Sequence, residues 1–189
     1  MKLCYIDLET TGTKPYKHAI HQIAGFIEID NILEKEFEFR LAPHEYAEID
    51  PKALEIAGVS EDTLHTYEEP DKAFKRLRSL LSSYVNRFDR SDKFYFIAYN
   101  AHFDDSHLRA LWQMQGDKYY GSIFSWPPLD VAQIAAFHLL EQRDLTQNFK
   151  LETVCQLFEL PFDSAAAHDA LYDIRKTREL FLKLKGATL

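Results

Sequence analysis

The sequence predicts an α/β protein with a central mixed sheet and helices packed on its faces. Three β-rich segments open the chain, and amphipathic helical patterns with one further apolar strand make up the remainder. The chain has 189 residues, which at about 100 to 200 residues per domain predicts a single domain over residues 1–189. No repeat, low-complexity run or linker rich in Pro, Gly or Ser interrupts it.

The first three predicted strands cover residues 2–8, 20–30 and 32–41. In the third, Phe37, Phe39 and Leu41 alternate with charged residues, which is typical of a strand with one buried face. We expect these strands to form an antiparallel meander.

Two long helices are predicted by apolar residues at three- and four-residue spacing. The first covers residues 71–88, with its basic residues outward, and its apolar stripe is Phe74, Leu77, Leu81, Tyr84, Val85 and Phe88. The second covers residues 167–184, and its apolar face is Ala170, Ile174, Thr177, Phe181 and Leu184.

One strand and three shorter helices are predicted between the two long helices. Residues 93–100 have the pattern of a buried strand. A helix through Gln113 follows, with Asp105 or Ser106 as its cap, and two more helices are predicted at residues 130–140 and 151–158.

Composition excludes several classes of protein. No apolar run approaches the roughly 18 to 20 residues of a membrane span, and Asp7 and Glu9 lie where a signal peptide needs apolar residues. We therefore expect a cytoplasmic protein with no membrane contact. Cys4 and Cys155 lie in apolar patterns, so we expect two buried cysteines and no four-cysteine zinc site.

The usual nucleotide-binding and hydrolase loops are also missing. The sequence has no G-x-G-x-x-G, no G-x-x-x-x-G-K-[ST], no G-x-S-x-G and no H-E-x-x-H. Carboxylates and histidines remain as the residues that could carry chemistry.

The charge is unevenly distributed along the chain. The formal net charge is −8, with 6 basic against 16 acidic residues in 1–71 and 7 basic against 2 acidic residues in 72–93. Residues 175–185 are also basic. Two interpretations stay open: an acidic, metal-bearing cleft with basic rims that contact phosphates, or basic stretches that are simply solvated helix faces.

The first group of candidate residues is Asp7 and Glu9, followed by Thr10, Thr11 and Gly12. Alternate residues of a strand share a face, so the two carboxylates lie on one side of the sheet. Carboxylates that close repel each other, and a divalent cation between them is the natural partner. The alternative is a solvated strand end, since chance alone gives about one D-x-E in a chain of this composition.

The second group, residues 100–105, lies where the predicted fourth strand gives way to a helix. A helix start needs one capping Asp, and Asp104 and Asp105 provide two. The spare carboxylate can reach toward whatever the first pair binds. We expect Phe103 to lie in the core.

The third group is His168 and Asp173 near the end of the chain. Five residues along one helix place side chains about 140° apart, so both face one site only if His168 precedes the helix and Asp173 lies within it. The alternative is a solvated His and a capping Asp. Asp169 is predicted to be a first-turn helix charge and not a ligand.

Together and in this order, the three groups resemble the motifs of the DEDDh exonucleases, the DnaQ-like group that includes polymerase proofreading subunits, ribonuclease T and repair exonucleases. That family has D-x-E on the first strand, N-x-x-F-D entering a helix and H-x4-D near the C-terminus. Here the motifs are Asp7 with Glu9, residues 100–104, and His168 with Asp173. The resemblance implies a ribonuclease H-like fold, with a five-stranded mixed sheet flanked by helices.

The resemblance also implies a mechanism and a set of site residues. Two divalent cations, Mg²⁺ or Mn²⁺, would be held by Asp7, Glu9, Asp104 and Asp173, and His168 would be the general base. Substrate would be contacted by Glu9, Thr10, Thr11, Asn100 and His168. The expected reaction is 3′ to 5′ exonuclease hydrolysis of phosphodiester bonds at nucleic acid 3′ ends, with DNA favoured and single-stranded or frayed ends preferred, releasing nucleoside 5′-monophosphates.

Three alternatives remain open. One is an RNA-trimming exonuclease or an oligoribonuclease-like enzyme, although the latter has E-M-T-G where this chain has Glu9-Thr10-Thr11-Gly12. Another is a subunit of a polymerase or repair complex, and the last is a silent binding module. The family includes homodimers, so a homodimer is a possible state.

Overall fold

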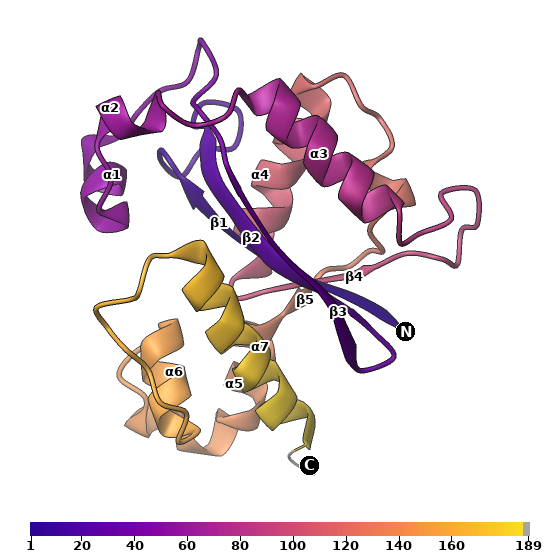
Figure 1. The fold of residues 1–189 in the computed structure, drawn as a ribbon. Coiled ribbons are helices and arrows are strands. Elements are labelled where there is room, and N and C mark those ends of the chain that lie inside the picture. The colour runs from indigo at the N-terminus through magenta and orange to yellow at the C-terminus, as the bar shows by residue number, and fades with distance from the viewer. Residues whose placement is uncertain (187–189) are drawn as a thin grey trace.

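A five-stranded mixed sheet lies at the centre of the computed structural model, which describes residues 1–186 (Figure 1). The strands are β1 (Lys2–Thr10), β2 (Ile20–Ile29), β3 (Ile32–Arg40), β4 (Tyr95–Ala98) and β5 (Leu129–Asp130). Their spatial order is β3-β2-β1-β4-β5. The first three strands pair antiparallel, and β4 and β5 continue the sheet in parallel with β1. The predicted meander and fold class are both confirmed.

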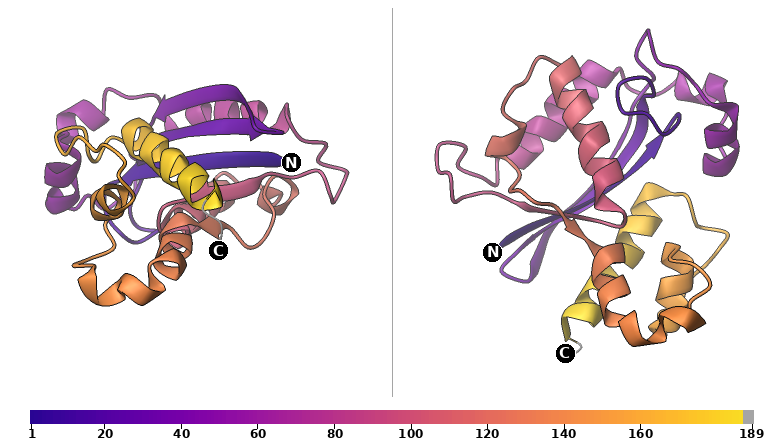
Figure 2. Two further views of the ribbon diagram at one scale, coloured as in Figure 1. Left: turned by 90° about the horizontal axis from the view of Figure 1, so that it is seen from below. Right: turned by 180° about the vertical axis from the view of Figure 1, so that it is seen from behind.

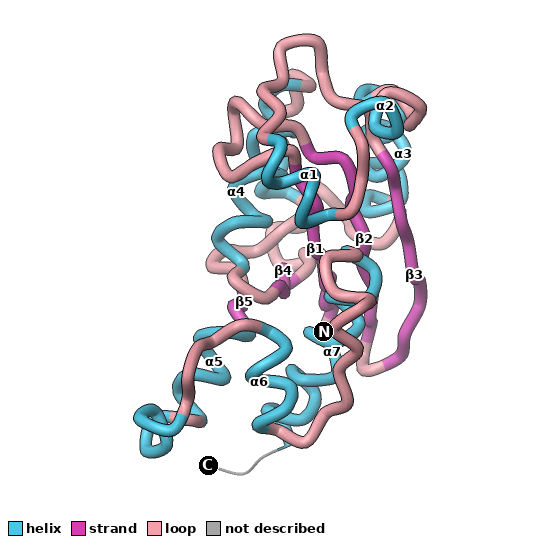
Figure 3. Tube along the Cα trace, turned by 90° about the vertical axis from the view of Figure 1, so that its left-hand side faces the viewer, coloured by secondary structure: helices cyan, strands magenta, loops and turns pink. Residues whose placement is uncertain are grey.

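Helices cover both faces of this sheet (Figure 2). The helices are α1 (Pro51–Ala57), α2 (Glu61–Leu64), α3 (Pro70–Ser82), α4 (Ala101–Met114), α5 (Val131–His138), α6 (Leu151–Leu157) and α7 (Ala170–Gly186). One hydrophobic core contains residues of α3 and α4, and the other contains residues of α5, α6 and α7. Short 3₁₀ turns follow at Tyr120–Ser122 and Leu140–Leu145. As Figure 3 shows, β5 leads directly into α5.

The alternation of β1 decides which side its acidic residues face. Cys4 and Ile6 are buried in the core under α3 and α4, whereas Leu3 and Tyr5 are buried in the core under α7. Residues two apart on a strand share a face, so the acidic residues at positions 7 and 9 continue the row that faces α7. Cys4 and Cys155 are buried free thiols, as predicted.

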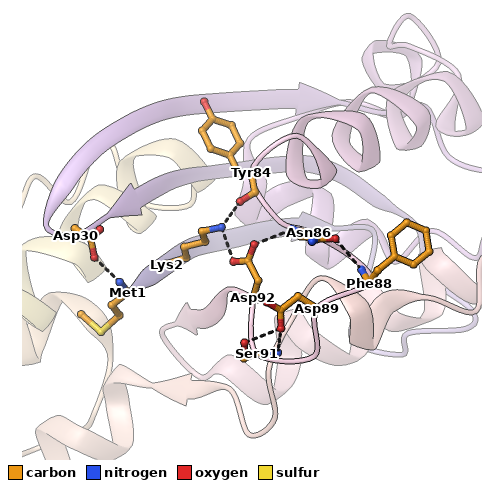
Figure 4. A network of polar contacts seen from close by, with 9 residues as sticks. All are labelled: Met1, Lys2, Asp30, Tyr84, Asn86, Phe88, Asp89, Ser91 and Asp92. Carbon is orange, nitrogen blue, oxygen red and sulfur yellow. Dashed lines mark hydrogen bonds and ion pairs between the residues drawn. The ribbon is translucent and has the colours of Figure 1, made fainter.

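The connection after α3 differs from the prediction. The helix ends at Ser82 instead of continuing to residue 88, and Phe88 is 93% exposed. Figure 4 shows the contacts of the segment that follows the helix: Lys2 binds the carbonyl oxygen of Tyr84 at 2.6 Å and also pairs with Asp92. These contacts, and a 2.8 Å hydrogen bond from the Asn86 N–H to Asp92, fix an irregular loop against the start of β1.

The remaining helix boundaries shift by a few residues. The helix predicted from residue 105 begins at Ala101, and the last helix begins at Ala170 because Asp169 caps it by accepting the N–H of Tyr172 at 3.0 Å. All of the predicted apolar face of that helix is buried or half-buried. No helix within residues 1–186 is long and apolar enough to cross a membrane.

Candidate active site

The first two carboxylates lie at the C-terminal end of β1, beside the start of α4. The N–H of Leu8, between Asp7 and Glu9, donates a 3.1 Å hydrogen bond to Oδ1 of Asp104. Asp104 lies in the first turn of α4 and is 2% exposed. This bond brings the second motif to the first, and a shared ligand of Asp104 and the first pair stays a prediction.

The segment after Glu9 turns sharply and is held by its own side chains. Gly12 has a φ of 154°, and a Cβ there would lie 2.7 Å from the His18 ring, so only glycine fits. The Thr10 hydroxyl donates to the Gly12 carbonyl at 2.7 Å, and the Thr11 hydroxyl donates to the Glu48 carbonyl at 2.7 Å. Both hydroxyls are therefore used by the turn, and contact of these two residues with substrate stays a prediction.

The third motif has the geometry that its spacing requires. His168 lies in the loop before α7, with φ at 65°, and Asp173 lies in the first turn of the helix. The backbone N–H of His168 donates to Oδ2 of Asp173 at 3.1 Å. Histidine and carboxylate thus belong to one compact turn.

The structure brings residues of the first and third motifs together. Ligand atoms of Glu9, His168 and Asp173 lie within 4.8 Å of one another. Asp7 and Asp104 are not part of this group of possible ligands within residues 1–186. They remain neighbours of it, because their charges and those of Glu9 and Asp173 interact.

Burial, and then the repulsion between neighbouring carboxylates, makes the acidic residues of the site hard to ionise. Burial, and then the charges of Asp104, Glu9 and Asp173, raises the pKa of Asp7 well above its usual range. Burial and the charge of Asp173 raise the pKa of Glu9 to about 8. Burial also raises the pKa values of Asp104 and Asp173. A bound cation would reverse this repulsion and keep the carboxylates ionised.

The donor set fits hard divalent cations. Oδ1 of Asp173 is buried and has no hydrogen-bond partner among the described atoms, so it is free to bind a ligand. Carboxylate oxygens are the donors that Mg²⁺ and Mn²⁺ prefer, whereas a cysteine-rich set would favour zinc. Burial of several carboxylates without a neutralising partner is costly, which gives a cation a reason to bind there.

A cleft of about 580 Å³ opens beside this cluster. It is lined by His168, Asp173 and Asn100, and by the aromatic rings of Tyr99, directly after β4, and of the segments around α6. Asn100 adopts a left-handed conformation and is exposed, with no cap bond from its side chain. The volume of the cleft is in the range of small-ligand sites, so the cleft has room for a nucleotide.

Sequence reasoning missed Asp130 and misplaced Asp105. Asp130 caps α5 and accepts the N–H of Asn100 at 3.0 Å, so it fixes the left-handed turn that opens α4. Asp105 is not the helix cap, because α4 begins four residues earlier. It is buried and accepts hydrogen bonds at 2.7 Å from the Tyr120 hydroxyl and from Arg109. Phe103, expected in the core, is only half-buried.

The sequence does contain a pattern that predicts Asp130 as a helix cap. An Asp directly after an apolar residue and before a helix is a capping pattern, but the pattern does not say that the same carboxylate also holds a second turn. That second contact depends on β4 and β5 lying side by side, and β5 has only two residues.

The fold and the site together define a class: an α/β protein whose central strand delivers carboxylates to a histidine-bearing cleft fitted for divalent cations. The sequence model of the exonuclease family named for RNase T matches residues 4–181, and the chain belongs to this family. It is accordingly a nuclease that hydrolyses nucleic acid from the 3′ end, of a family that requires divalent metal.

Curated relatives and solved structures agree with this assignment. Ribonuclease T of Photorhabdus laumondii is 29% identical over 189 residues, covering 95% of this chain and 81% of the relative. Ribonuclease T of Hahella chejuensis has the same identity and coverage. Exonuclease I of E. coli, solved in complex with a dT13 oligonucleotide, superposes with a TM-score of 0.77 at 22% identity.

The likeness to exonuclease I concerns the fold. It covers 97% of this chain and 40% of the exonuclease I chain, so this chain spans less than half the length of that enzyme. The ribonuclease H-like prediction, with its five-stranded mixed sheet and flanking helices, is thereby confirmed.

Proposed function

We propose that this exonuclease removes single nucleotides from the 3′ end of single-stranded nucleic acid and releases nucleoside 5′-monophosphates by a two-metal mechanism. The observation that carries the proposal is the meeting of Glu9, His168 and Asp173 within 4.8 Å, at one end of a nucleotide-sized cleft. The neighbouring carboxylates Asp7 and Asp104 complete the set that the three motifs predict.

Asp7, Glu9, Asp104 and Asp173 would hold two divalent cations, Mg²⁺ or Mn²⁺. When bound, such ions activate a water and neutralise charge on the scissile phosphodiester. The protein fixes the ligands before substrate arrives: Asp104 through the N–H of Leu8, and Asp173 through the N–H of His168. Ligands held in this way need little reorganisation on binding.

His168 would take the proton of the attacking water. It is exposed at the mouth of the cleft, next to two of the proposed ligands, so its ring can reach a water between them. A histidine exchanges protons near neutral pH, and general-base catalysis of this kind typically contributes about 10²- to 10⁴-fold in rate.

The 3′ end of the nucleic acid would be bound by residues around the group formed by Glu9, His168 and Asp173. Asn100 lines the cleft with a side chain that makes no cap hydrogen bond, and a ligand atom of Glu9 lies within 4.8 Å of those of His168 and Asp173, which also line it. Rings of Tyr99, Phe149 and Phe162 line the same cleft, and aromatic rings stack bases with little regard for sequence. Backbone at Thr10 and Thr11 is the further predicted contact.

The names and titles of the similar proteins differ in whether the nucleic acid is DNA or RNA. Exonuclease I was solved with a DNA oligonucleotide, in line with our expectation that DNA is favoured. The curated relatives are named ribonuclease T, which supports RNA trimming as a second candidate function. Reading of the 2′ hydroxyl depends on contacts that the motifs do not specify. A homodimer, a polymerase or repair partner and a cytoplasmic location likewise remain predictions.

The test is digestion of 5′-labelled single strands of equal sequence in DNA and RNA, with Mg²⁺, Mn²⁺ or EDTA. We expect a ladder that shortens from the 3′ end, depends on metal and is lost in Asp173→Asn. Asp163→Asn is the matched control, because this exposed carboxylate lies in the loop before α7 and outside the ligand group. If neither strand is shortened by the wild-type protein with either metal, the proposed function is wrong.

A further inference from the structure

A row of three polar side chains crosses the sheet beside the site. Glu9 pairs with Gln22 in the β1–β2 register, and Gln22 pairs with Arg40 in the β2–β3 register. Residues directly opposite each other project from the same face, so the row lies on the face that carries α7. It begins at a proposed metal ligand and ends at the edge strand.

Gln22 is buried in the middle of this row, and all three functions of its amide are used. Its Nε2 donates to Oε1 of Glu38 at 3.0 Å and to Oδ2 of Asp169 at 3.1 Å. Its Oε1 accepts the N–H of Ala170 at 3.4 Å. Because both hydrogens go to carboxylates and the oxygen goes to an N–H, the amide can point only one way.

Arg40 contacts the same two carboxylates as Gln22. Its Nε donates to Oε1 of Glu38 at 2.8 Å, and its guanidinium lies 3.6 Å from Oδ2 of Asp169. Oδ2 of Asp169 is therefore bound by Gln22 and approached by Arg40. The residue held in this way is the immediate neighbour of His168.

Packing alone does not hold the His168 loop. The cleft of about 580 Å³ lies against one side of the loop, and a second cleft of about 340 Å³ lies against the other. Both clefts are lined by Ala167 and His168. His168 also has a φ of 65°, a conformation that costs a non-glycine residue energy and persists only when its surroundings impose it.

We infer that Gln22 is a positioning residue for catalysis, which fixes the His168 imidazole relative to Glu9 by clamping Asp169 and the first N–H of α7 to the sheet. The inference rests on the proposed function, since it gives His168 the task of a base. Gln22 itself touches neither metal nor substrate. It acts through the two residues that follow His168, and its contribution is to the geometry of proton transfer.

The first test is Gln22→Met, which keeps the length of the side chain and removes its hydrogen bonds. We expect kcat to fall about 10-fold, the lower end of the range typical of residues that orient catalytic ligands, while KM changes less than about twofold. Thr177→Val is the matched control, because Thr177 is a buried polar residue on the sheet-facing side of α7 and its hydroxyl has no partner among the described atoms. We expect that control to keep wild-type kcat.

A double-mutant cycle separates positioning of His168 from general damage to the site. In a His168→Ala background, Gln22→Met is expected to change the single-turnover rate less than twofold, because the group it positions is gone. An equal 10-fold loss in that background, or wild-type kcat in Gln22→Met, would overturn the inference. If the wild-type protein itself shortens no strand, the failure belongs to the proposed function and not to this inference.

A reciprocal exchange provides a rescue test if Gln22→Met folds poorly. Gln22→Glu places a third carboxylate beside Glu38 and Asp169, and we expect a larger loss of kcat than with Met. Adding Asp169→Asn restores a donor and an acceptor across that contact and keeps a residue that can cap α7. Recovery of kcat by about fivefold or more supports the clamp, and no recovery contradicts it.

Discussion

At the scale of single residues, the acidity of the site makes stability depend on pH and metal. Glu9 has a pKa raised from 4.5 to about 8 in the folded protein. Between these values the folded, metal-free protein keeps a proton that the unfolded chain has released, so stability falls as pH rises from about 4.5 to about 8. Above that pH the effect is complete, because both states have lost the proton.

Glu9→Gln should therefore stabilise the metal-free protein at high pH. Since burial and then the charge of Asp173 disfavour the ionised Glu9 carboxylate, we expect a Tm in EDTA at pH 8 that is higher than wild type by roughly 2 to 4 °C for each kcal/mol of stability gained, and a smaller difference at pH 5. Thermal unfolding followed by circular dichroism measures both. Mg²⁺ should raise the Tm of wild type more than that of the variant, and an equal Tm difference at the two pH values would contradict this account.

His168 is expected to affect the chemical step and not the metal sites. His168→Ala should lower kcat by about 10²- to 10⁴-fold, with the metal concentration for half-maximal activity changed less than threefold. His65→Ala, at the exposed C-terminal end of α2, serves as the control and should keep wild-type kcat. A loss of kcat below threefold in His168→Ala would mean that another group takes the proton.

At the scale of elements, two ion pairs hold α7 on the sheet, and their side chains differ greatly in solvent exposure. Arg178 binds Glu28 of β2 at 2.6 Å, and Glu28 is 1% exposed. Arg175 binds Glu36 of β3 at 3.0 Å, where both side chains are about half exposed. Removal of one partner from a buried ion pair leaves the other charge buried and unpaired, whereas an exposed ion pair contributes little to the free energy of unfolding.

Arg178→Met should destabilise the protein by about 3 to 5 kcal/mol, and Arg175→Met by less than about 1 kcal/mol. Urea unfolding monitored by fluorescence compares the two. Adding Glu28→Gln to Arg178→Met should restore most of the loss, because it removes the buried charge. Equal destabilisation by the two single variants would mean that burial of Glu28 is not the reason.

Most of the strands and helices, but not all, can be predicted from the hydrophobic pattern of the sequence. The first three strands and the apolar faces of α3 and α7 follow from periodicity alone, because each buries one regular face. Phe88 is an exception: it continues the spacing of α3, yet the helix ends at Ser82, and the loop after it is held by Lys2 from the start of the chain and by Asp92 within the loop itself. The two-residue strand β5 is too short to give a pattern.

The candidate site was predicted only in part for the same reason. Its five motif residues could be named because they lie in short local patterns. Asp130 and Gln22 could not, since their roles arise where separate strands meet. Asp105 has the local pattern of a cap and became a buried partner of Tyr120 once the helix began earlier.

At the scale of the whole molecule, the basic stretches turn out to be largely neutralised by the protein itself. Four of the basic residues of segment 72–93 form ion pairs: Lys72 with Glu69, Lys75 with Asp71, Arg76 with Glu68, and Arg78 with Asp117. In segment 175–185, Arg175, Lys176 and Arg178 are also paired. Paired helix faces therefore explain these stretches better than phosphate-binding rims do.

The net charge is −8, and seven of the twelve basic residues of these two stretches form ion pairs, so the protein should bind nucleic acid with little dependence on salt. Each phosphate neutralised by Lys or Arg adds about −0.7 to the slope of log K against log salt for a single strand. About two such contacts give a slope near −1.4, or a loss of affinity of roughly sevenfold between 50 and 200 mM salt. Fluorescence anisotropy of a labelled 12-nucleotide strand, with the Asp104→Asn variant and Mg²⁺ at fixed concentration, measures the slope. A slope of about −4 or steeper would show that unpaired basic residues bind the strand, and that a charged surface outside the metal site supplies most of the affinity.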